Sequence, residues 1–400
     1  PLQGIKVIDL TSMVSGPLTT MILADQGAEV IKVENPKGGD FTRSVSSRKN
    51  SFSASFLNNN RNKKSFALNL KSEEGKSILR NLTRDADVFI QNFRPNVIER
   101  MGLGEEEIRK FAPDIIYVSI SGFGDKGPYT GKPVYDPLVQ ALSGLTTIQG
   151  GSDGARPRLV RTILPDKLTG ITCAQAVTAA LLERHRTGKG QHIRLSMLDA
   201  IVSFRWSSDM SSQTFVGKEF PEQKAQSFID LIYETADGYI SVAVQSDKEW
   251  LGLTRALEKP EWLEDERFRT AALRQTNINE RLQLTQEVLR NKSSKDWLEL
   301  LEEHDVPCAP VLKRREIIEH PQIQQNKTVI QYQHPIAGEI RQSRAAAQFS
   351  NYPKLNYRGA PLLGEHSKDL LAAAGYAAKD IEDFLDRGIV HCQESEPTDD

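Results

Sequence analysis

Short apolar runs alternate with amphipathic segments along the first part of the chain. The runs typical of buried strands are KVIDL (6–10), AEVIKVE (28–34), SFALNL (65–70), DVFIQNF (87–93) and DIIYVSISG (114–122). Between them lie stretches with the periodicity of a helix, at residues 16–27, 72–86 and around 105–112. Strands that alternate with helices through short connections predict an α/β fold with a parallel sheet covered by helices on both faces.

The pattern changes after about residue 225. Residues 238–246 alternate apolar and polar side chains, as a half-exposed strand does, and three amphipathic segments follow around Trp250, Leu282 and Trp297. The third begins with SSKD, which predicts a capping box from Ser293 to Asp296. We interpret residues 228–320 as a second, smaller α/β domain. The remaining predictions are strands at 327–335 and 338–342, a helix at 367–375 and a disordered tail at 391–400.

Composition excludes several classes of protein. The 51 basic and 53 acidic residues leave a net charge of −2, so no overall positive field is available to hold a nucleic acid. No apolar run is long enough to span a membrane, and the chain opens on a strand instead of a signal peptide, so we expect a cytoplasmic protein. Cys173, Cys308 and Cys392 are far apart and the seven histidines lack ligand spacing, so we expect no metal site.

Two local motifs raise the question of phosphate binding. The segment GFGDKG (122–127) matches G-x-G-x-x-G, but loop composition follows it where a dinucleotide site needs a helix, so we interpret it as a glycine loop. The segment NNNRNKKS (58–65) carries Arg61, Lys63 and Lys64. A solvated loop is the ordinary explanation of such a cluster, and contact with one phosphorylated cofactor is the alternative.

One acidic residue, Asp166, lies in the apolar segment LVRTILPDKLTG (159–170), just before a helix predicted from near Lys167 to about Arg186. Aspartate is a favoured N-cap, because its oxygen accepts a hydrogen bond from a free amide of the first helical turn. A partly desolvated carboxylate between Leu164 and Leu168 is also able to attack an acyl group without a general base. The local sequence leaves both interpretations open.

An ordered series of motifs resembles the class III CoA-transferases, the family that includes formyl-CoA transferase and carnitine CoA-transferase. The motifs are GIKVIDLTSMVSGP, LADQGAEVIKVENPKGGDFTR, NRNKKSFALNLKSEEGK, DVFIQNFRPNVIERMGLG, ISGFGDKGPY, LPDKLTG, HRTGKGQHIRLSMLDA, VPCAPV and RGAPLLGEH. Together they cover roughly residues 1–375. Their order along the chain is more specific than any one of them.

The resemblance implies a fold and a set of partners. It implies a Rossmann-like large domain built from both chain ends, 1–227 and 321–390, a small domain at 228–320, and two subunits threaded through each other as an interlocked homodimer. It implies no permanently bound cofactor. Coenzyme A and acyl-CoA are substrates, and a small carboxylic acid is the other partner.

The resemblance also assigns roles to single residues. Asp166 matches the nucleophile of the family, which becomes an acyl anhydride and then a CoA thioester. Tyr135 and Asp136 match residues that line the acyl pocket. The residues that match CoA contacts are Val14, Ser15, Leu68, Lys71, Asn92, Phe93, Arg100 and Met101. Val14 stands where the family often has glutamine, so this side chain offers no hydrogen bond to an oxyanion.

Two alternatives fit parts of this pattern. The α-methylacyl-CoA racemases share the fold, but they move a proton with a histidine in a Gly-His-Asp segment, where this chain has Val134, Tyr135 and Asp136. A catalytically inert CoA-binding protein is the second alternative, and the intact Asp166 argues against it. We therefore favour a CoA-transferase.

The acids that exchange CoA are less clearly indicated. The segment KAQSFIDLIY (224–233) contains no glycine, whereas formyl-CoA transferases have a glycine-rich loop there, so formate and oxalate are not the favoured substrates. Arg156, Arg158 and Arg161 either pair with the second carboxylate of a dicarboxylic acid or form a solvated basic face.

Overall fold

The computed structural model describes residues 1–217, 230–352 and 357–393. The chain divides into two compact units. The first comprises Pro1–Gly150, Arg156–Glu219 and Thr328–Asp400, and the second comprises Gly151–Ala155 and Phe220–Lys327. The glycine-free segment 224–233 lies largely outside the described residues, as do residues 394–400 of the predicted tail.

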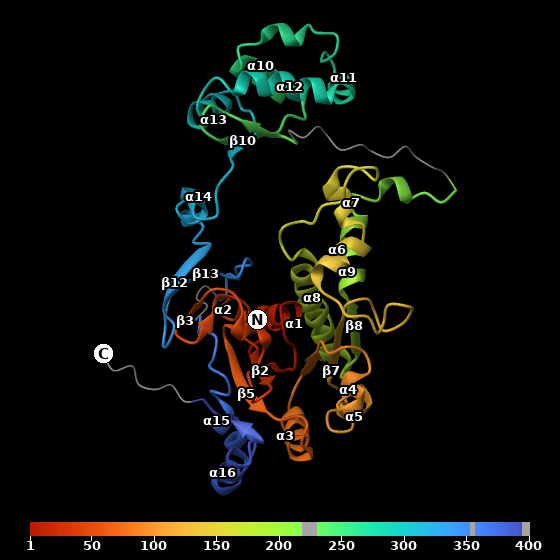
Figure 1. Cartoon of the computed structure of the whole chain (residues 1–400), viewed down its shortest axis with the longest axis vertical. Helices are drawn as coiled ribbons and strands as arrows, with labels where there is room; N and C mark the ends of the chain where they lie inside the picture. The colour runs from red at the N-terminus through yellow and green to blue at the C-terminus, as the bar shows by residue number, and fades with distance from the viewer. Residues whose placement is uncertain (218–229, 353–356, 394–400) are drawn as a thin grey trace. The chain divides into compact units, whose positions relative to one another are not determined.

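The first unit is built on a seven-stranded sheet with the order β14-β5-β2-β1-β6-β7-β8. Figure 1 shows β2 beside β5 and β7 beside β8. All neighbouring strands are parallel except β14, which pairs with β5 in the antiparallel direction. The predicted α/β fold with a parallel sheet is therefore confirmed. The strands are β1 (Lys6–Asp9), β2 (Glu29–Glu34), β5 (Lys63–Leu68), β6 (Val88–Gln91), β7 (Ile116–Ser121), β8 (His192–Ser196) and β14 (Val390–His391).

The chain reverses its direction across the sheet at β1. This strand pairs with β2 on one side and with β6 on the other. The loops that follow β1 and β6 therefore lead to opposite faces, and they leave a crevice at the carboxyl ends of these strands. Such a switch point is the usual ligand-binding position of an open parallel sheet.

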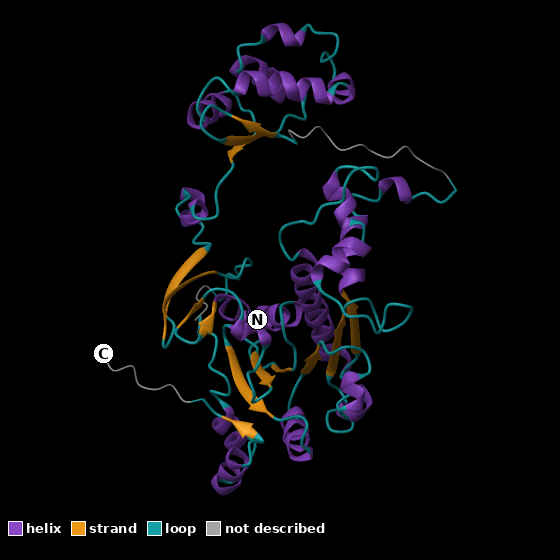
Figure 2. Cartoon of the chain, viewed as in Figure 1, coloured by secondary structure: helices purple, strands orange, loops and turns teal. Residues whose placement is uncertain are grey.

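Helices cover both faces of this sheet, as Figure 2 shows in purple and orange. Successive strand residues point to opposite faces, so Val7 and Ile8 belong to two different cores. The core around Val7 contains side chains of α1 (Ser15–Asp25) and α8 (Leu164–Thr187). The core around Ile8 contains side chains of α3 (Glu73–Thr83), α4 (Val97–Arg100), α5 (Glu105–Arg109), α15 (Ser367–Ala373) and α16 (Ala378–Asp386).

The C-terminal part of the chain contributes to this sheet as well. Val390 and His391 form β14 against Leu68 and Ala67 of β5. The tail predicted from residue 391 therefore begins inside a strand, because pairing with a sheet edge satisfies backbone groups that the polar sequence alone does not account for.

The remaining elements of the first unit are smaller. They are β3 (Arg48–Lys49), β4 (Phe52–Ser53), α2 (Ala54–Asn60), α6 (Asp136–Leu142), α7 (Leu145–Gly150), α9 (Met197–Trp206), β12 (Val329–His334) and β13 (Gly338–Ser343). The segment 122–127 forms no helix, and the chain stays irregular from the end of β7 to α6, as expected for a glycine loop.

The second unit has its own core, in which Trp250 and Trp297 are buried. Its sheet has the order β11-β10-β9. The predicted capping box at Ser293 is only half formed: Ser293 accepts a hydrogen bond from the Asp296 amide, while the complete box occurs at Ser246 and Glu249. The elements are β9 (Ile232–Glu234), β10 (Tyr239–Val242), α10 (Asp247–Ala256), α11 (Ala271–Thr276), α12 (Ile278–Leu289), α13 (Ser294–Glu303), β11 (Cys308–Pro310) and α14 (Pro321–Gln325).

Candidate active site

A cavity of about 560 Å³ lies at the carboxyl ends of β1, β2, β5 and β6. Its position is the crevice that the strand order predicts. Five of the residues predicted to contact CoA line it together: Leu68, Lys71, Phe93, Arg100 and Met101. The lining residues extend from Leu10 to Met101, which are 91 positions apart in the sequence. They meet because the parallel strands that precede them all end at one edge of the sheet.

The charges around this cavity favour an anion. Glu34 and Asp40 also line it, but each is buried against a cation, Arg43 at 2.7 Å and Lys32 at 2.9 Å. Lys76 lines the cavity as well and pairs with an exposed glutamate. Because both acids are paired with cations, the other basic side chains that line the cavity leave it with a net positive charge. This charge suits a phosphorylated ligand.

The loop between β1 and α1, residues 11–14, forms one wall of this cavity through Thr11 and Ser12. Asn92, which follows β6, holds this loop from across the switch point. Its Nδ2 donates to the Ser12 carbonyl at 2.8 Å, and its Oδ1 accepts from the Ser12 amide at 3.0 Å. Asn92 therefore shapes the wall of the cavity and is not one of the residues that line it.

The basic cluster at 58–65 is not a solvated loop, and none of its three cations lines this cavity. Arg61 is buried and pairs with Asp25, and Lys63 is fully buried against Asp9. Lys64 lies on the surface and pairs with Glu29. The solvated-loop interpretation is therefore wrong for Arg61, which follows α2, and for Lys63, which begins β5, because both side chains are buried beside carboxylates from distant parts of the chain.

Asp166 belongs to the first turn of α8 and is not its N-cap. The helix begins at Leu164, earlier than the predicted start near Lys167, and its N-cap is Ile163, which makes no side-chain capping bond. The cap interpretation is therefore wrong. Pro165 explains the earlier start, because its fixed φ and missing amide suit the first turn of a helix.

The carboxylate of Asp166 lies close to a second carboxylate. Asp136, in the first turn of α6, is buried and accepts a hydrogen bond from the Asp166 amide at 3.1 Å through Oδ2. Its other oxygen accepts from Gln140 Nε2 at 2.6 Å. Burial raises the pKa of Asp136. Burial and the charge of Asp136 raise the pKa of Asp166 to about 6, although hydrogen bonds from the hydroxyl and amide of Ser15 oppose that change.

Helix α1 presents its amino end to Asp166. Ser15 is the first residue of α1 and is buried, and the preceding Val14 provides no side-chain cap. No N-cap side chain therefore accepts a hydrogen bond from the first amides of α1, and this end of the helix carries a partial positive charge. These groups are suited to stabilise negative charge that develops beside Asp166.

A close contact between α1 and α8 fixes this arrangement. Thr19 Oγ1 on α1 donates to the Gly170 carbonyl on α8 at 3.1 Å. A Cβ atom at Gly170 would come within 2.9 Å of the Ser15 carbonyl oxygen. Glycine at this position lets the two helices approach and brings Ser15 next to Asp166.

The two residues predicted to line an acyl pocket have opposite environments. Asp136 is buried beside Asp166, whereas Tyr135 is 66% exposed.

The sequence interpretation missed Asn35, Gly39, Asp40, Asn69 and Lys76, which line the cavity. Their common signal was available: each lies within ten residues after the end of a strand of the predicted parallel sheet, and parallel strands have their carboxyl ends at one edge.

The residues that the structure describes contain neither a cluster suited to a metal ion nor a membrane-spanning helix. Histidine, cysteine, aspartate and glutamate side chains of the described segments nowhere gather in threes in a way that fits a metal ion. No helix in the same segments is both long enough and apolar enough to cross a membrane.

Comparisons with known proteins give a consistent result. The family described as CoA-transferase family III matches residues 2–367. Succinyl-CoA:glutarate CoA-transferase of Mus musculus is 34% identical over 403 residues, which cover 99% of this chain and 91% of that protein. Formyl-CoA:oxalate CoA-transferase of Escherichia coli O6:H1 is 33% identical over 408 residues, which cover 95% of this chain and 97% of that protein.

A solved structure is similar over nearly the whole chain as well. The crystal structure of a CAIB/BAIF family protein from Brucella suis has a TM-score of 0.82 and 30% sequence identity, and the match covers 94% of this chain and 99% of that one.

Proposed function

This chain belongs to CoA-transferase family III and is an enzyme of the CoA-transferase class, and from that premise we propose that it transfers CoA from an acyl-CoA to a short dicarboxylic acid through a covalent intermediate on Asp166. One observation carries this proposal. A single loop connects the two halves of the site, since Thr11 and Ser12 line the cavity and Ser15 hydrogen-bonds to Asp166. A CoA held in the cavity would have its thioester end near this loop.

The proposed reaction has four steps and no net change in protons. The Asp166 carboxylate attacks the donor thioester carbonyl, the carbon–sulfur bond breaks, and an acyl–aspartyl anhydride and CoA thiolate form. The thiolate attacks the aspartyl carbonyl, which releases the donor acid and leaves an aspartyl-CoA thioester. The acceptor carboxylate then attacks this thioester and releases the thiolate. The thiolate attacks the acceptor acyl group, which gives the new acyl-CoA and restores Asp166.

Ser15 and Asp136 act in opposite directions on the pKa of Asp166, which Ser15 lowers and Asp136 raises. The amino end of α1, with the Ser15 hydroxyl and amide, favours the negative charge of each tetrahedral intermediate. Asp136 disfavours the ionised form of Asp166 and thereby raises the basicity of its carboxylate. With a pKa of about 6, Asp166 remains mostly ionised at neutral pH.

Lys71 and Arg100 are the proposed phosphate contacts. Both line the cavity, and the structure gives neither side chain an ion-pair partner among the residues it describes. Leu68, Phe93 and Met101 supply apolar surface in the same cavity and suit the adenine ring.

A dicarboxylic acid is the proposed acceptor. Glutarate and oxalate are the acids in the names of the two curated relatives. Arg158 and Arg161 are exposed, and Arg161 precedes Asp166 by only five residues in the sequence, so we propose that one of these guanidinium groups binds the second carboxylate. A panel of C2 to C6 dicarboxylic acids and matched monocarboxylic acids, tested with succinyl-CoA as donor, should show transfer mainly to the former.

A homodimer of the interlocked kind is the proposed assembly. Neighbouring helices α6, α7, α8 and α9 all expose large apolar side chains. They are Leu138, Leu142, Ile148, Ile171, Leu182, Phe204 and Trp206. Exposed apolar side chains on adjacent helices favour burial against a second copy of the chain.

The intermediate is tested by trapping it. The protein is incubated with succinyl-CoA without acceptor and then with hydroxylamine, which converts an aspartyl thioester or anhydride into a hydroxamate. Mass spectrometry of the peptide that contains Asp166 should show the hydroxamate, and the Asp166→Ala variant should show none. An unmodified wild-type Asp166 would contradict the proposal. Rapid exchange of the α-hydrogen of a 2-methylacyl-CoA in deuterated water would favour the racemase alternative instead.

A further inference from the structure

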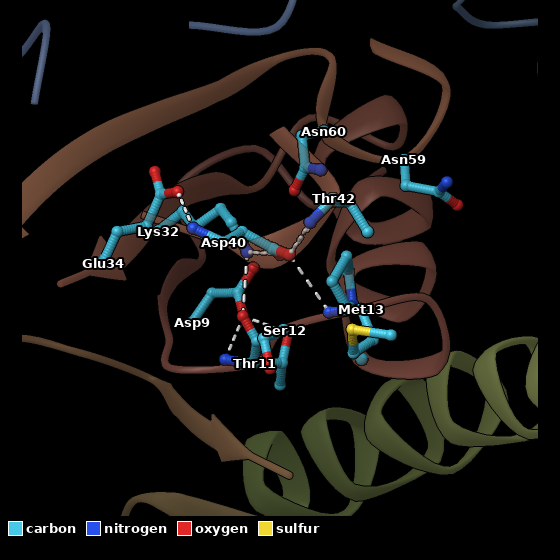
Figure 3. A network of polar contacts seen from close by, with 12 residues as sticks. Asp9, Thr11, Ser12, Met13, Lys32, Glu34, Asp40, Thr42, Asn59 and Asn60 are labelled. Atoms are coloured by element: carbon cyan, nitrogen blue, oxygen red, sulfur yellow. Dashed lines mark hydrogen bonds and ion pairs between the residues drawn. The ribbon is translucent and has the colours of Figure 1, made fainter. Parts of the chain in front are cut away.

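A buried ionic network lies directly beneath the loop at residues 11–14. Asp9 and Lys32 are completely buried, and Lys63 and Asp40 are each only 4% exposed. Figure 3 shows Asp9, Lys32 and Asp40 close to the backbone of Thr11, Ser12 and Met13. The network holds as many cations as carboxylates when the pair of Arg43 and Glu34 is included.

Asp40 and Lys32 hold opposite ends of this loop. Asp40 Oδ1 accepts from the Met13 amide at 3.3 Å, while Asp40 Oδ2 lies 2.9 Å from Lys32 Nζ. Lys32 Nζ donates to the Thr11 carbonyl at 2.8 Å. The ion pair thus contacts the backbone on both sides of Ser12, which Asn92 holds from the opposite direction.

The orientation of Asp40 is itself strongly determined. The amide and the hydroxyl of Thr42 both donate to Asp40 Oδ1 at 2.9 Å. The amide of Asp40 donates to Glu34 Oε1 at 3.0 Å. A carboxylate held by this many donors is able to fix the position of a further donor, the Met13 amide, with little freedom.

The loop needs such support because of its backbone conformation. Met13 has a φ of 72°, which lies in the left-handed region that costs a non-glycine residue about 1 to 2 kcal/mol. Surrounding contacts must therefore hold Met13 there. This conformation turns the chain from the cavity wall at Ser12 into the first turn of α1, where Ser15 meets Asp166.

Stability alone is a weak explanation of this ion pair. Desolvation of two charges offsets most of their attraction, and apolar residues of similar volume are often equally stable. An ion pair that binds backbone groups on both sides of a turn nevertheless imposes a geometry that apolar residues do not.

We propose that Lys32 and Asp40 are positioning residues for CoA transfer, which act by holding residues 11–14 so that the amino end of α1 faces Asp166. This inference rests on the proposed function, because it concerns the rate at which Asp166 reacts. Neither residue needs to touch the reacting atoms, since their effect passes through the Thr11 carbonyl and the Met13 amide.

The test compares Asp40→Asn with a matched control, Asp25→Asn. Asp25 is equally buried, forms a shorter ion pair with Arg61 at 2.6 Å, and lies at the far end of α1. The rate of Asp166 acylation at saturating succinyl-CoA should fall about 10- to 100-fold in Asp40→Asn. The same rate should change less than about threefold in Asp25→Asn.

A second variant covers the case in which Asp40→Asn does not fold. Thr42→Val keeps both charges and removes only the hydroxyl that donates to Asp40 Oδ1. It should lower the acylation rate about two- to fivefold, and it should leave the CoA dissociation constant and the Michaelis constant of the acceptor nearly unchanged.

The outcomes separate the two proposals. A wild-type enzyme that forms no Asp166 adduct contradicts the proposed function and removes the basis of this inference. A normal adduct in wild type with an unchanged acylation rate in Asp40→Asn or Thr42→Val overturns the positioning role alone. An equal loss in Asp25→Asn, or a loss confined to CoA affinity, overturns it too.

Discussion

As the proposed nucleophile, Asp166 must be ionised to attack a thioester, yet the fold puts it beside a second carboxylate in a partly buried position. Burial and the charge of Asp136 together raise its pKa to about 6. The formation of the acyl adduct at saturating donor should therefore fall as the pH drops through about 6, because the protonated acid is a poor nucleophile. Rapid quench measurements between pH 4.5 and 8 would show this acid limb.

Replacing Asp136 provides the control for that prediction. In Asp136→Asn the neighbouring charge is lost, so the acid limb should move to lower pH. An acid limb that does not move would show that burial, and not Asp136, controls the ionisation.

The same pKa predicts a pH-dependent effect on stability. A carboxyl whose pKa rises from 3.8 to about 6 on folding binds more protons in the folded state between these values. Its contribution to stability is therefore lost as the pH rises through this range. Asp166→Asn should stabilise the protein by about 1 to 2 kcal/mol at pH 7.5 and by much less at pH 4.5. Urea denaturation at both pH values tests this, with the exposed Asp114→Asn as a control.

At the level of elements, the site depends on how closely α1 approaches α8. A methyl group at Gly170 would meet the Ser15 carbonyl and the Leu18 side chain, at 2.9 and 3.1 Å from the new Cβ. Gly170→Ala should separate the two helices by a few tenths of an ångström, lower the stability by about 1 to 3 kcal/mol and slow the acylation of Asp166.

Gly131→Ala is the matched control for this substitution. Nothing lies within 4 Å of a Cβ atom at Gly131, and this glycine does not have a left-handed φ. Stability and acylation rate should both stay near the wild-type values. A Gly170→Ala variant that loses stability but acylates normally would show that Ser15 does not need its present distance from Asp166.

At the level of the whole molecule, the exposed apolar side chains of α6 to α9 predict self-association. Sedimentation should give a mass near twice the 44.7 kDa of one chain. The double substitution Leu182→Glu with Phe204→Glu should weaken or abolish that dimer, because it puts charges among apolar side chains that are exposed in the single chain. Leu273→Glu on α11 replaces an exposed leucine of the second unit and should leave the dimer intact.

The sequence by itself determined five of the seven strands of the large sheet, and the family. Strands β1, β2, β5, β6 and β7 were predicted within a few residues of their bounds, because buried parallel strands are continuous apolar runs. Five CoA-contact predictions also converge on one cavity. Residues that follow parallel strands lie at the same edge of the sheet, and this holds independently of the rest of the fold.

Only the tertiary structure decided which charged residues are buried and what they meet. Arg61, Lys63 and Asp40 are polar in sequence and look solvated, yet each meets a partner from a segment between 8 and 54 residues away. The local sequence of Asp166 equally suggested a cap. Its ionisation depends on Asp136, thirty residues earlier in the chain, and on the end of α1. Such electrostatic effects depend on distances in space, which neither periodicity nor local propensity contains.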